Sequence, residues 1–104
     1  MLGQADVVEA GPIVVDHRAR QVRVWGVPVR LSGREFELAA RLASEPRRVF
    51  TKAELLRDIW GIRTNDIRTR TVDSHASRLR RKLEAAGARD VVANDWGVGY
   101  RLLE

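Results

Sequence analysis

The stretch TRTVDSHASRLRRKLEAAG, residues 69–87, combines an apolar repeat of helical spacing with five arginine and lysine side chains. On a helix of about 3.6 residues per turn, its four regularly spaced apolar side chains fall within about 60° of one another. These side chains are Val72, Ala76, Leu79 and Leu83. The opposite face carries Arg70, Ser74, Ser77, Arg78 and Arg81. The pattern predicts an amphipathic helix over about residues 69–86, with one buried face and one basic face.

Two helix-start signals of the same form precede this helix. In LSGREF, Ser32 is the predicted N-cap and Glu35 its partner in a capping box. In FTKAEL, Thr51 and Glu54 occupy the same two positions. The second helix is predicted to stop at Gly61, because glycine readily adopts the left-handed conformation that ends helices. The sequence therefore predicts three helices, with a polar loop between the second and the third.

The segments on either side of the helices alternate with the period of two that is typical of strands. PIVVD, QVRVW and VPVRL, within residues 12–31, predict a small N-terminal antiparallel sheet. Pro28 lacks a backbone donor, so its strand is expected at a sheet edge. VVAN and YRLL flank DWGVG and predict a C-terminal β-hairpin. Residues 1–11 are interpreted as an N-terminal tail or interdomain linker, and residues 12–104 as one α+β domain.

Length and composition exclude several classes of protein. The 104 residues suit a single domain, and the absence of cysteine excludes disulfides and thiolate metal sites. The longest apolar runs are too short to span a membrane, and the first residues lack the pattern of a signal peptide. The expected location is therefore the cytoplasm, without membrane association.

The positive charge of the chain has a local source. Lysine and arginine number 19 against 14 aspartate and glutamate residues, giving a formal net charge of +5. Residues 63–82 contain seven basic and two acidic side chains, a difference that equals the excess of the whole chain. A concentrated basic surface favours a polyanionic partner through steering and counterion release.

The order of the predicted elements indicates which polyanion this basic surface binds. The second helix, a loop and the basic third helix form a helix-turn-helix, and the hairpin that follows adds a wing. A helix fits the major groove of B-DNA, where arginine can donate two hydrogen bonds to guanine. Flanking basic side chains can bind phosphates and set the orientation of the domain. The predicted class is a winged helix-turn-helix that binds double-stranded DNA.

Three longer motifs resemble a known family. LSGREFELAARLASEPRRVFTKAELLRDIWG, then RTVDSHASRLRRKLE, then WGVGYRL are similar to the C-terminal effector domain of OmpR/PhoB-type response regulators. The resemblance covers residues 12–103 and implies a winged helix with a four-stranded N-terminal sheet. It also implies transcription regulation in a two-component system, a head-to-tail dimer on DNA, and contact with RNA polymerase. The sequence is compatible both with an effector domain cut from a longer protein and with a stand-alone regulator.

The resemblance and the helical wheel together assign candidate roles. Arg78 is the first expected base contact, and three further base contacts are expected at Arg81, Ser74 and Ser77. The expected contacts to the DNA backbone are Arg70, Thr71, His75, Arg80, Lys82 and Arg101. The loop expected to contact RNA polymerase includes Arg63, Thr64, Asn65 and Asp66. The wing, residues 91–103, is expected on the DNA backbone or in the minor groove.

The wing tip departs from the family pattern. Trp96 precedes Gly97 where related sequences often carry an arginine that can enter a narrow A·T-rich minor groove. Tryptophan cannot supply that charge, so we expect a weak preference for A·T-rich DNA at the wing. Replacement of Trp96 with arginine should strengthen that preference in a binding assay, and unchanged affinity and preference would contradict this interpretation.

Other interpretations remain open at this point. The main alternative is a winged-helix module that binds an acidic protein partner, and RNA is a weaker third option because no aromatic platform is evident. His75 could instead bond to the helix backbone, and Asp73 is expected to orient Arg70 or Arg80 or to meet the helix start. Trp25 and Trp60 are interpreted as packing residues. We expect no metal, no cofactor and no catalytic activity, because no metal-binding cluster, nucleophile motif or phosphate-binding loop is present.

Overall fold

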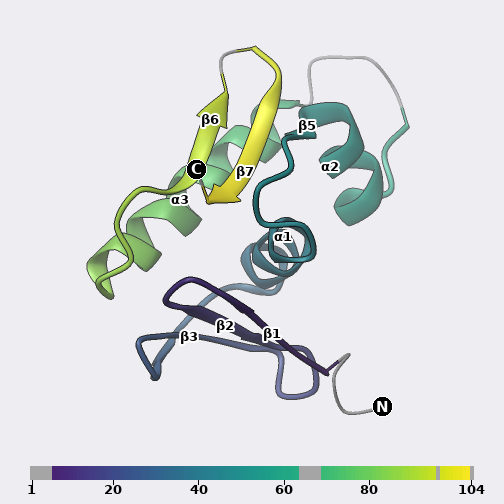
Figure 1. Ribbon diagram of the computed structural model, residues 1–104. Helices are drawn as coiled ribbons and strands as arrows, with labels where there is room; N and C mark the ends of the chain where they lie inside the picture. The colour runs from purple at the N-terminus through teal and green to yellow at the C-terminus, as the bar shows by residue number, and fades with distance from the viewer. Residues whose placement is uncertain (1–5, 64–68, 96, 104) are drawn as a thin grey trace.

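The computed structural model describes residues 6–63, 69–95 and 97–103. Within these residues the chain forms two antiparallel sheets with three helices, and α1 lies between the sheets (Figure 1). The first sheet runs in the order β1 (Val7–Ala10), β2 (Ile13–Asp16), β3 (Gln21–Val24) and β4 (Val27–Val29). The second sheet runs in the order β5 (Phe50–Thr51), β7 (Gly99–Leu103) and β6 (Val91–Asp95). The helices are α1 (Gly33–Ala43), α2 (Lys52–Trp60) and α3 (Thr69–Ala85).

The N-terminal sheet confirms one prediction and corrects another. β4, which contains Pro28, lies at an edge as expected. Residues 7–10, however, were predicted as part of a tail and instead form β1, which pairs with the whole length of β2. These residues form a strand because the apolar pair Val7–Val8 precedes a tight turn, in which Gly11 has a φ of 59°, and the turn joins β1 to β2 as a hairpin. Ala10 is consequently buried in the core.

Both predicted capping boxes are present. The Ser32 hydroxyl accepts from the Glu35 backbone N–H at 3.2 Å, and the Glu35 carboxylate accepts from the Ser32 N–H at 3.0 Å. Thr51 and Glu54 make the same reciprocal pair at 3.0 and 2.9 Å. Gly61 ends α2 with a φ of 73°, as its position predicted. These bonds satisfy helix-end donors that would otherwise lack partners, so the starts of α1 and α2 are locally determined.

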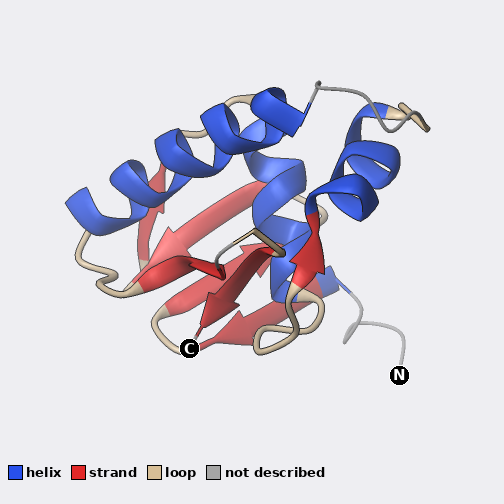
Figure 2. Ribbon diagram, turned by 90° about the horizontal axis from the view of Figure 1, so that it is seen from above, coloured by secondary structure: helices blue, strands red, loops and turns tan. Residues whose placement is uncertain are grey.

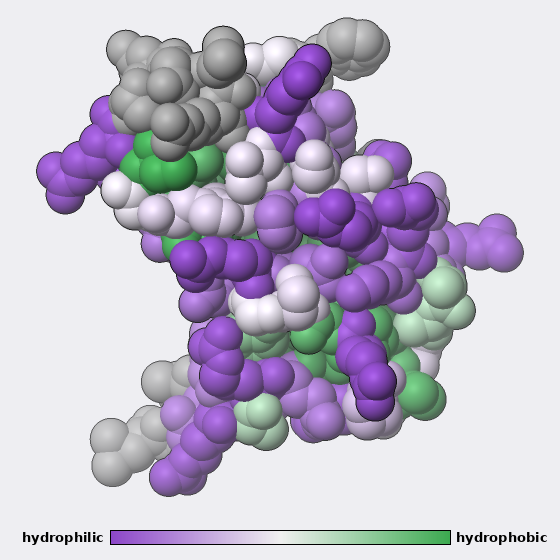
Figure 3. All heavy atoms as spheres, turned by 180° about the vertical axis from the view of Figure 1, so that it is seen from behind, coloured by the Kyte–Doolittle hydropathy of each residue, from purple (hydrophilic) through white to green (hydrophobic). Residues whose placement is uncertain are grey.

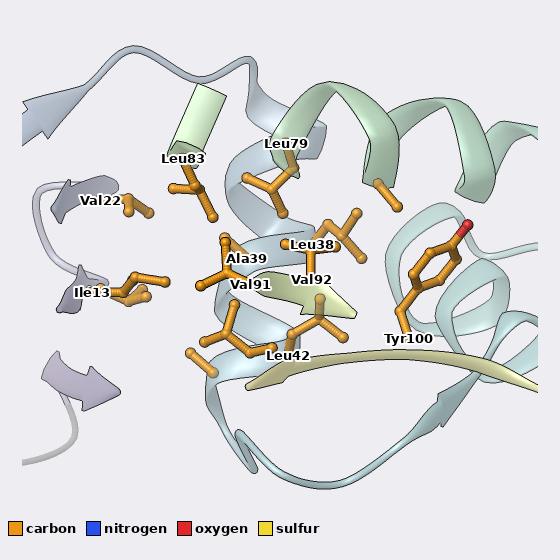
Figure 4. Packing of buried hydrophobic residues seen from close by; sticks show 14 of the residues in the cluster. Ile13, Val22, Leu38, Ala39, Leu42, Leu79, Leu83, Val91, Val92 and Tyr100 are labelled. Carbon is orange, nitrogen blue, oxygen red and sulfur yellow. The ribbon is translucent and has the colours of Figure 1, made fainter. Parts of the chain in front are cut away.

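The core forms around α1, which contacts strands of both sheets and both other helices. Seen from above, α1 stands between α3 and α2 (Figure 2). Val72, Ala76, Leu79 and Leu83 are each at most 1% exposed, which confirms the predicted buried face of α3. Leu79 and Leu83 point from α3 into the cluster, where they meet side chains of α1 and β6 (Figure 4). No helix of the described ranges is long and apolar enough to cross a membrane.

The C-terminal sheet differs from a simple hairpin in two ways. β5, which the sequence did not predict, pairs with β7 through Phe50 opposite Tyr100 and through Thr51 opposite Gly99. β6 is irregular at Val92, which has a φ of 55° and no pairing partner in β7, while Val91 and Ala93 on either side keep one continuous register with Leu103 and Arg101. A regular strand turns consecutive side chains to opposite faces, yet Val91 and Val92 are both buried. Both valines belong to the buried core cluster.

Candidate nucleic-acid interface

The outer face of α3 carries the predicted base-contacting side chains in exposed positions. Ser74, Ser77, Arg78 and Arg81 are all exposed, as are Arg70 and Arg80. Thr71, His75, Lys82 and Arg101 are partly buried. The face of the molecule seen from behind is predominantly hydrophilic (Figure 3). The helix therefore combines a fully buried apolar row with an accessible row of cations and hydroxyls.

On the side of α3 that faces α1, a buried carboxylate interacts with two of the predicted DNA contacts. Glu35 is 3% exposed, and its Oε1 accepts from Lys82 Nζ at 2.6 Å. Its Oε2 lies 3.5 Å from Arg78 Nε. Burial opposes ionisation of Glu35, but hydrogen bonds from Lys82 and the Ser32 backbone, with the nearby positive charges, hold its pKa below the usual value. Glu35 is therefore an anion between α1 and α3 at neutral pH.

On the side that faces the wing, Asp73 joins three elements. Its Oδ1 accepts from the Tyr100 hydroxyl of β7 at 2.6 Å and forms an ion pair with Lys52 Nζ of α2 at 3.0 Å. The prediction that Asp73 orients Arg70 or Arg80 is wrong, because its partners among the described residues are Lys52 and Tyr100. No local sequence pattern indicates this network, since Tyr100 lies 27 residues away along the chain. The network couples the wing to the start of α3.

Tyr100 is the single tyrosine of the chain, so its ionisation can be followed directly. Burial first, and then the hydrogen bond and negative charge of Asp73, raise its pKa well above the usual value of about 10. A raised folded-state pKa means that Tyr100 contributes its stabilisation fully below about pH 10 and loses it as the pH rises further. A tyrosinate absorbance titration should therefore show a midpoint above about 10 in the folded protein.

In urea the same titration should return to a midpoint of about 10, and Asp73→Asn should lower the folded-state midpoint. Tyrosinate formation near pH 10 in the folded wild type would contradict the buried Tyr100–Asp73 bond.

On the side that faces α2, His75 has two partners. Its Nδ1 lies 2.8 Å from the Thr71 carbonyl oxygen, which can only accept, so this nitrogen carries the proton. The ring meets Trp60 edge to face, with centroids 5.0 Å apart. The alternative of a backbone-bonded histidine is therefore confirmed. The other ring nitrogen, Nε2, takes no part in that hydrogen bond. Trp60 packs partly buried against the core, as predicted.

The remaining predicted contact residues differ in whether they are paired with an acidic side chain and in whether the structure describes them. Arg70 and Arg81 have no ion-pair partner within the part of the chain that the structure describes. Arg101 lies 3.7 Å from Asp95 across the hairpin, measured from Nη2 to Oδ1. Gly97 is exposed with a φ of 69°, and Arg63 is exposed after α2. The predictions at Trp96, Thr64, Asn65 and Asp66 fall outside the described residues.

Trp25 corrects the prediction of a packing residue. Its side chain lies in the turn between β3 and β4 and is 70% exposed. Its Nε1 donates to the Gly87 carbonyl oxygen at 3.4 Å, which places it against the end of α3. An exposed apolar ring in a short turn could not be distinguished from a core residue by the alternation of the strand alone.

The sheet, three helices and hairpin define the winged-helix class. Comparison of the sequence with known proteins identifies the family. A family model described as "Transcriptional regulatory protein, C terminal" matches residues 26–102. The chain is 37% identical over 100 residues to the uncharacterized transcriptional regulatory protein YclJ of Bacillus subtilis, covering 95% of this chain and 43% of YclJ. It is 36% identical over 99 residues to SrrA of Staphylococcus aureus, covering 92% of this chain and 40% of SrrA. The chain thus spans about two fifths of these relatives.

Solved structures agree with this result. The DNA-binding domain of AdeR, solved in complex with an intercistronic region, superposes with a TM-score of 0.81 at 33% identity, covering 92% of this chain and 97% of that one. The RstA DNA-binding domain of Klebsiella pneumoniae, solved with the RstA box, gives 0.81 at 27% identity over 93% and 96% of the two chains. The chain belongs to the family of transcriptional regulatory protein C-terminal domains. The resemblance to OmpR/PhoB-type effector domains and the winged-helix fold are therefore confirmed.

Proposed function

We propose that this chain binds double-stranded DNA in a sequence-dependent manner and thereby regulates transcription. The observation that carries the proposal is the division of α3 into a buried apolar row and an exposed row of arginines and serines. An α-helix of this kind fits the major groove, and arginine and serine can bond to base edges and phosphates there. Similar domains solved with DNA support the same role and do not favour an acidic protein partner.

In this proposal α3 enters the major groove and the wing lies on the backbone or in the minor groove. The base-contacting set is Arg78, Arg81, Ser74 and Ser77. The backbone-contacting set is Arg70, Thr71, His75, Arg80 and Arg101. Lys82, predicted as a further backbone contact, is already paired with Glu35 in the structure.

The wider context is also a proposal, since the chain spans only part of its relatives. Similarity to OmpR/PhoB-type domains supports a head-to-tail dimer on direct repeats and contact with RNA polymerase through the segment after α2. It supports control by a two-component system in the cytoplasm, where the DNA lies. We assign the domain no catalytic role.

Selection of bound duplexes from a random pool tests the proposal. A sequence-dependent binder should enrich a motif, and its affinity for that motif should exceed that for a scrambled duplex by about 10³-fold or more. Recovery of no motif after repeated rounds would contradict the proposed function.

Replacement of Arg78 with alanine tests the assignment of a single side chain. If Arg78 reads a base, the change should cost roughly 1–3 kcal/mol of binding free energy and relax selection at one base pair. Affinity for each single-base variant of the selected duplex measures this directly. An equal loss of affinity on every sequence would instead identify Arg78 as a phosphate contact.

A further inference from the structure

Glu35 does more in this fold than complete a capping box. Its side chain is 4% exposed and lies under two half-exposed cations of α3, Lys82 and Arg78, whose side chains are 40% and 46% exposed. One carboxylate oxygen receives both the Ser32 backbone N–H and Lys82 Nζ. The other oxygen faces Arg78 Nε at 3.5 Å. A single buried anion thus interacts with two side chains of the proposed DNA-binding helix.

The second capping box of the chain shows that this arrangement is not required for capping. Glu54 accepts from the Thr51 backbone N–H in the same way as Glu35 accepts from Ser32. Its other oxygen pairs with Arg48, which precedes α2, and not with a side chain of α3. The two glutamates make the same pair of capping bonds and have different outer partners. The contact of Glu35 with α3 is therefore an additional feature of the fold.

We propose that Glu35 is a positioning residue of the DNA interface, which withholds Lys82 from phosphates and fixes the direction in which Arg78 approaches the bases. This inference rests on the proposed function. Lys82 bonded to a buried carboxylate at 2.6 Å must give up a charge-assisted hydrogen bond before it can neutralise a phosphate. Nonspecific DNA affinity is thereby kept low, because that affinity comes almost entirely from phosphate neutralisation.

Replacement of Glu35 with glutamine removes the charge and keeps the capping box, since glutamine also serves at this helix position. Affinity is measured on the selected duplex and on a scrambled duplex across a range of salt concentrations. We expect the slope of log K against log salt to steepen by about 0.9, the contribution of one additional phosphate contact. We also expect the ratio of selected to scrambled affinity to fall at least roughly fivefold, as the constraint on Arg78 is lost.

Glu54→Gln is the matched control, because it makes the same chemical change in the same motif. It should leave both the salt slope and the affinity ratio at wild-type values. Equal changes in the two variants would mean that only capping matters and would overturn the proposal. Wild-type values in Glu35→Gln would overturn it as well.

Lys82→Met provides a second measurement that keeps Glu35 and its capping bonds. If Glu35 withholds Lys82 from DNA, loss of the lysine charge should leave the salt slope unchanged. A slope shallower by about 0.9 would show that Lys82 neutralises a phosphate and would overturn the proposal. A wild type with a flat salt response and no selectivity would instead overturn the proposed function, and this inference with it.

Discussion

Replacement of Leu79 with alanine is expected to lower the free energy of unfolding by about 3 kcal/mol, within the 2–5 kcal/mol range of buried leucines. Leu79 is fully buried on the inner face of α3, where it joins the core around α1. Loss of its side chain removes transfer free energy and leaves a cavity under α3. Urea unfolding followed by circular dichroism measures the change as a lower midpoint with an unchanged slope.

Arg81→Ala is the matched control on the outer face of the same helix. Arg81 is exposed, so its removal should change the stability by no more than about 0.5 kcal/mol. It should nevertheless weaken DNA binding. A large stability loss in Arg81→Ala, or none in Leu79→Ala, would contradict the division of α3 into a packing face and a binding face.

Gly99→Ala is the second change with a large expected effect. A Cβ added at Gly99 would overlap the carbonyl group of Phe50 and crowd Thr51 Cα, both on the neighbouring strand β5. Because these are backbone atoms, they cannot move aside as a flexible side chain could. The strands β5 and β7 would have to separate, and we expect a cost of about 3 kcal/mol in unfolding free energy, at the upper end for overpacking. Urea unfolding measures it.

Gly33→Ala is the control for a glycine without such a neighbour. Gly33 opens α1 and has no atom near the position of an added Cβ, so alanine there should be neutral or slightly stabilising. If Gly99→Ala were equally neutral, the close approach of β5 to β7 would be wrong. DNA binding should follow stability in the Gly99 variant, because the wing then loses its support.

Helix starts and the buried face of α3 were predictable because local chemistry determines them. The capping boxes at Ser32 and Thr51 each lie within four consecutive residues, and the apolar row of α3 follows from helical spacing alone. β1 could also have been predicted from the sequence, since the pair Val7–Val8 followed by a glycine turn is a hairpin signal. β5 was not, because two residues are too few to show a strand period.

The contacts within the interface could not be predicted from local patterns. Lys82 meets Glu35 across 47 residues of sequence, and the chain offers many other acids to its basic side chains. Asp73 lies near Arg70 and Arg80 in sequence but pairs with Lys52 and accepts a hydrogen bond from Tyr100 in space. The fold decides these partners, so sequence identified which side chains face outward without identifying which of them are already paired.

The salt dependence of binding to the selected duplex tests the central claim most directly. If the outer face of α3 binds DNA, the affinity should fall steeply as salt rises, with a slope of about −0.9 for each phosphate neutralised. Arg70→Ala should reduce that slope by about one such contact while leaving the fold intact. A flat salt response of the wild type, with equal affinity for selected and scrambled duplexes, would contradict the account.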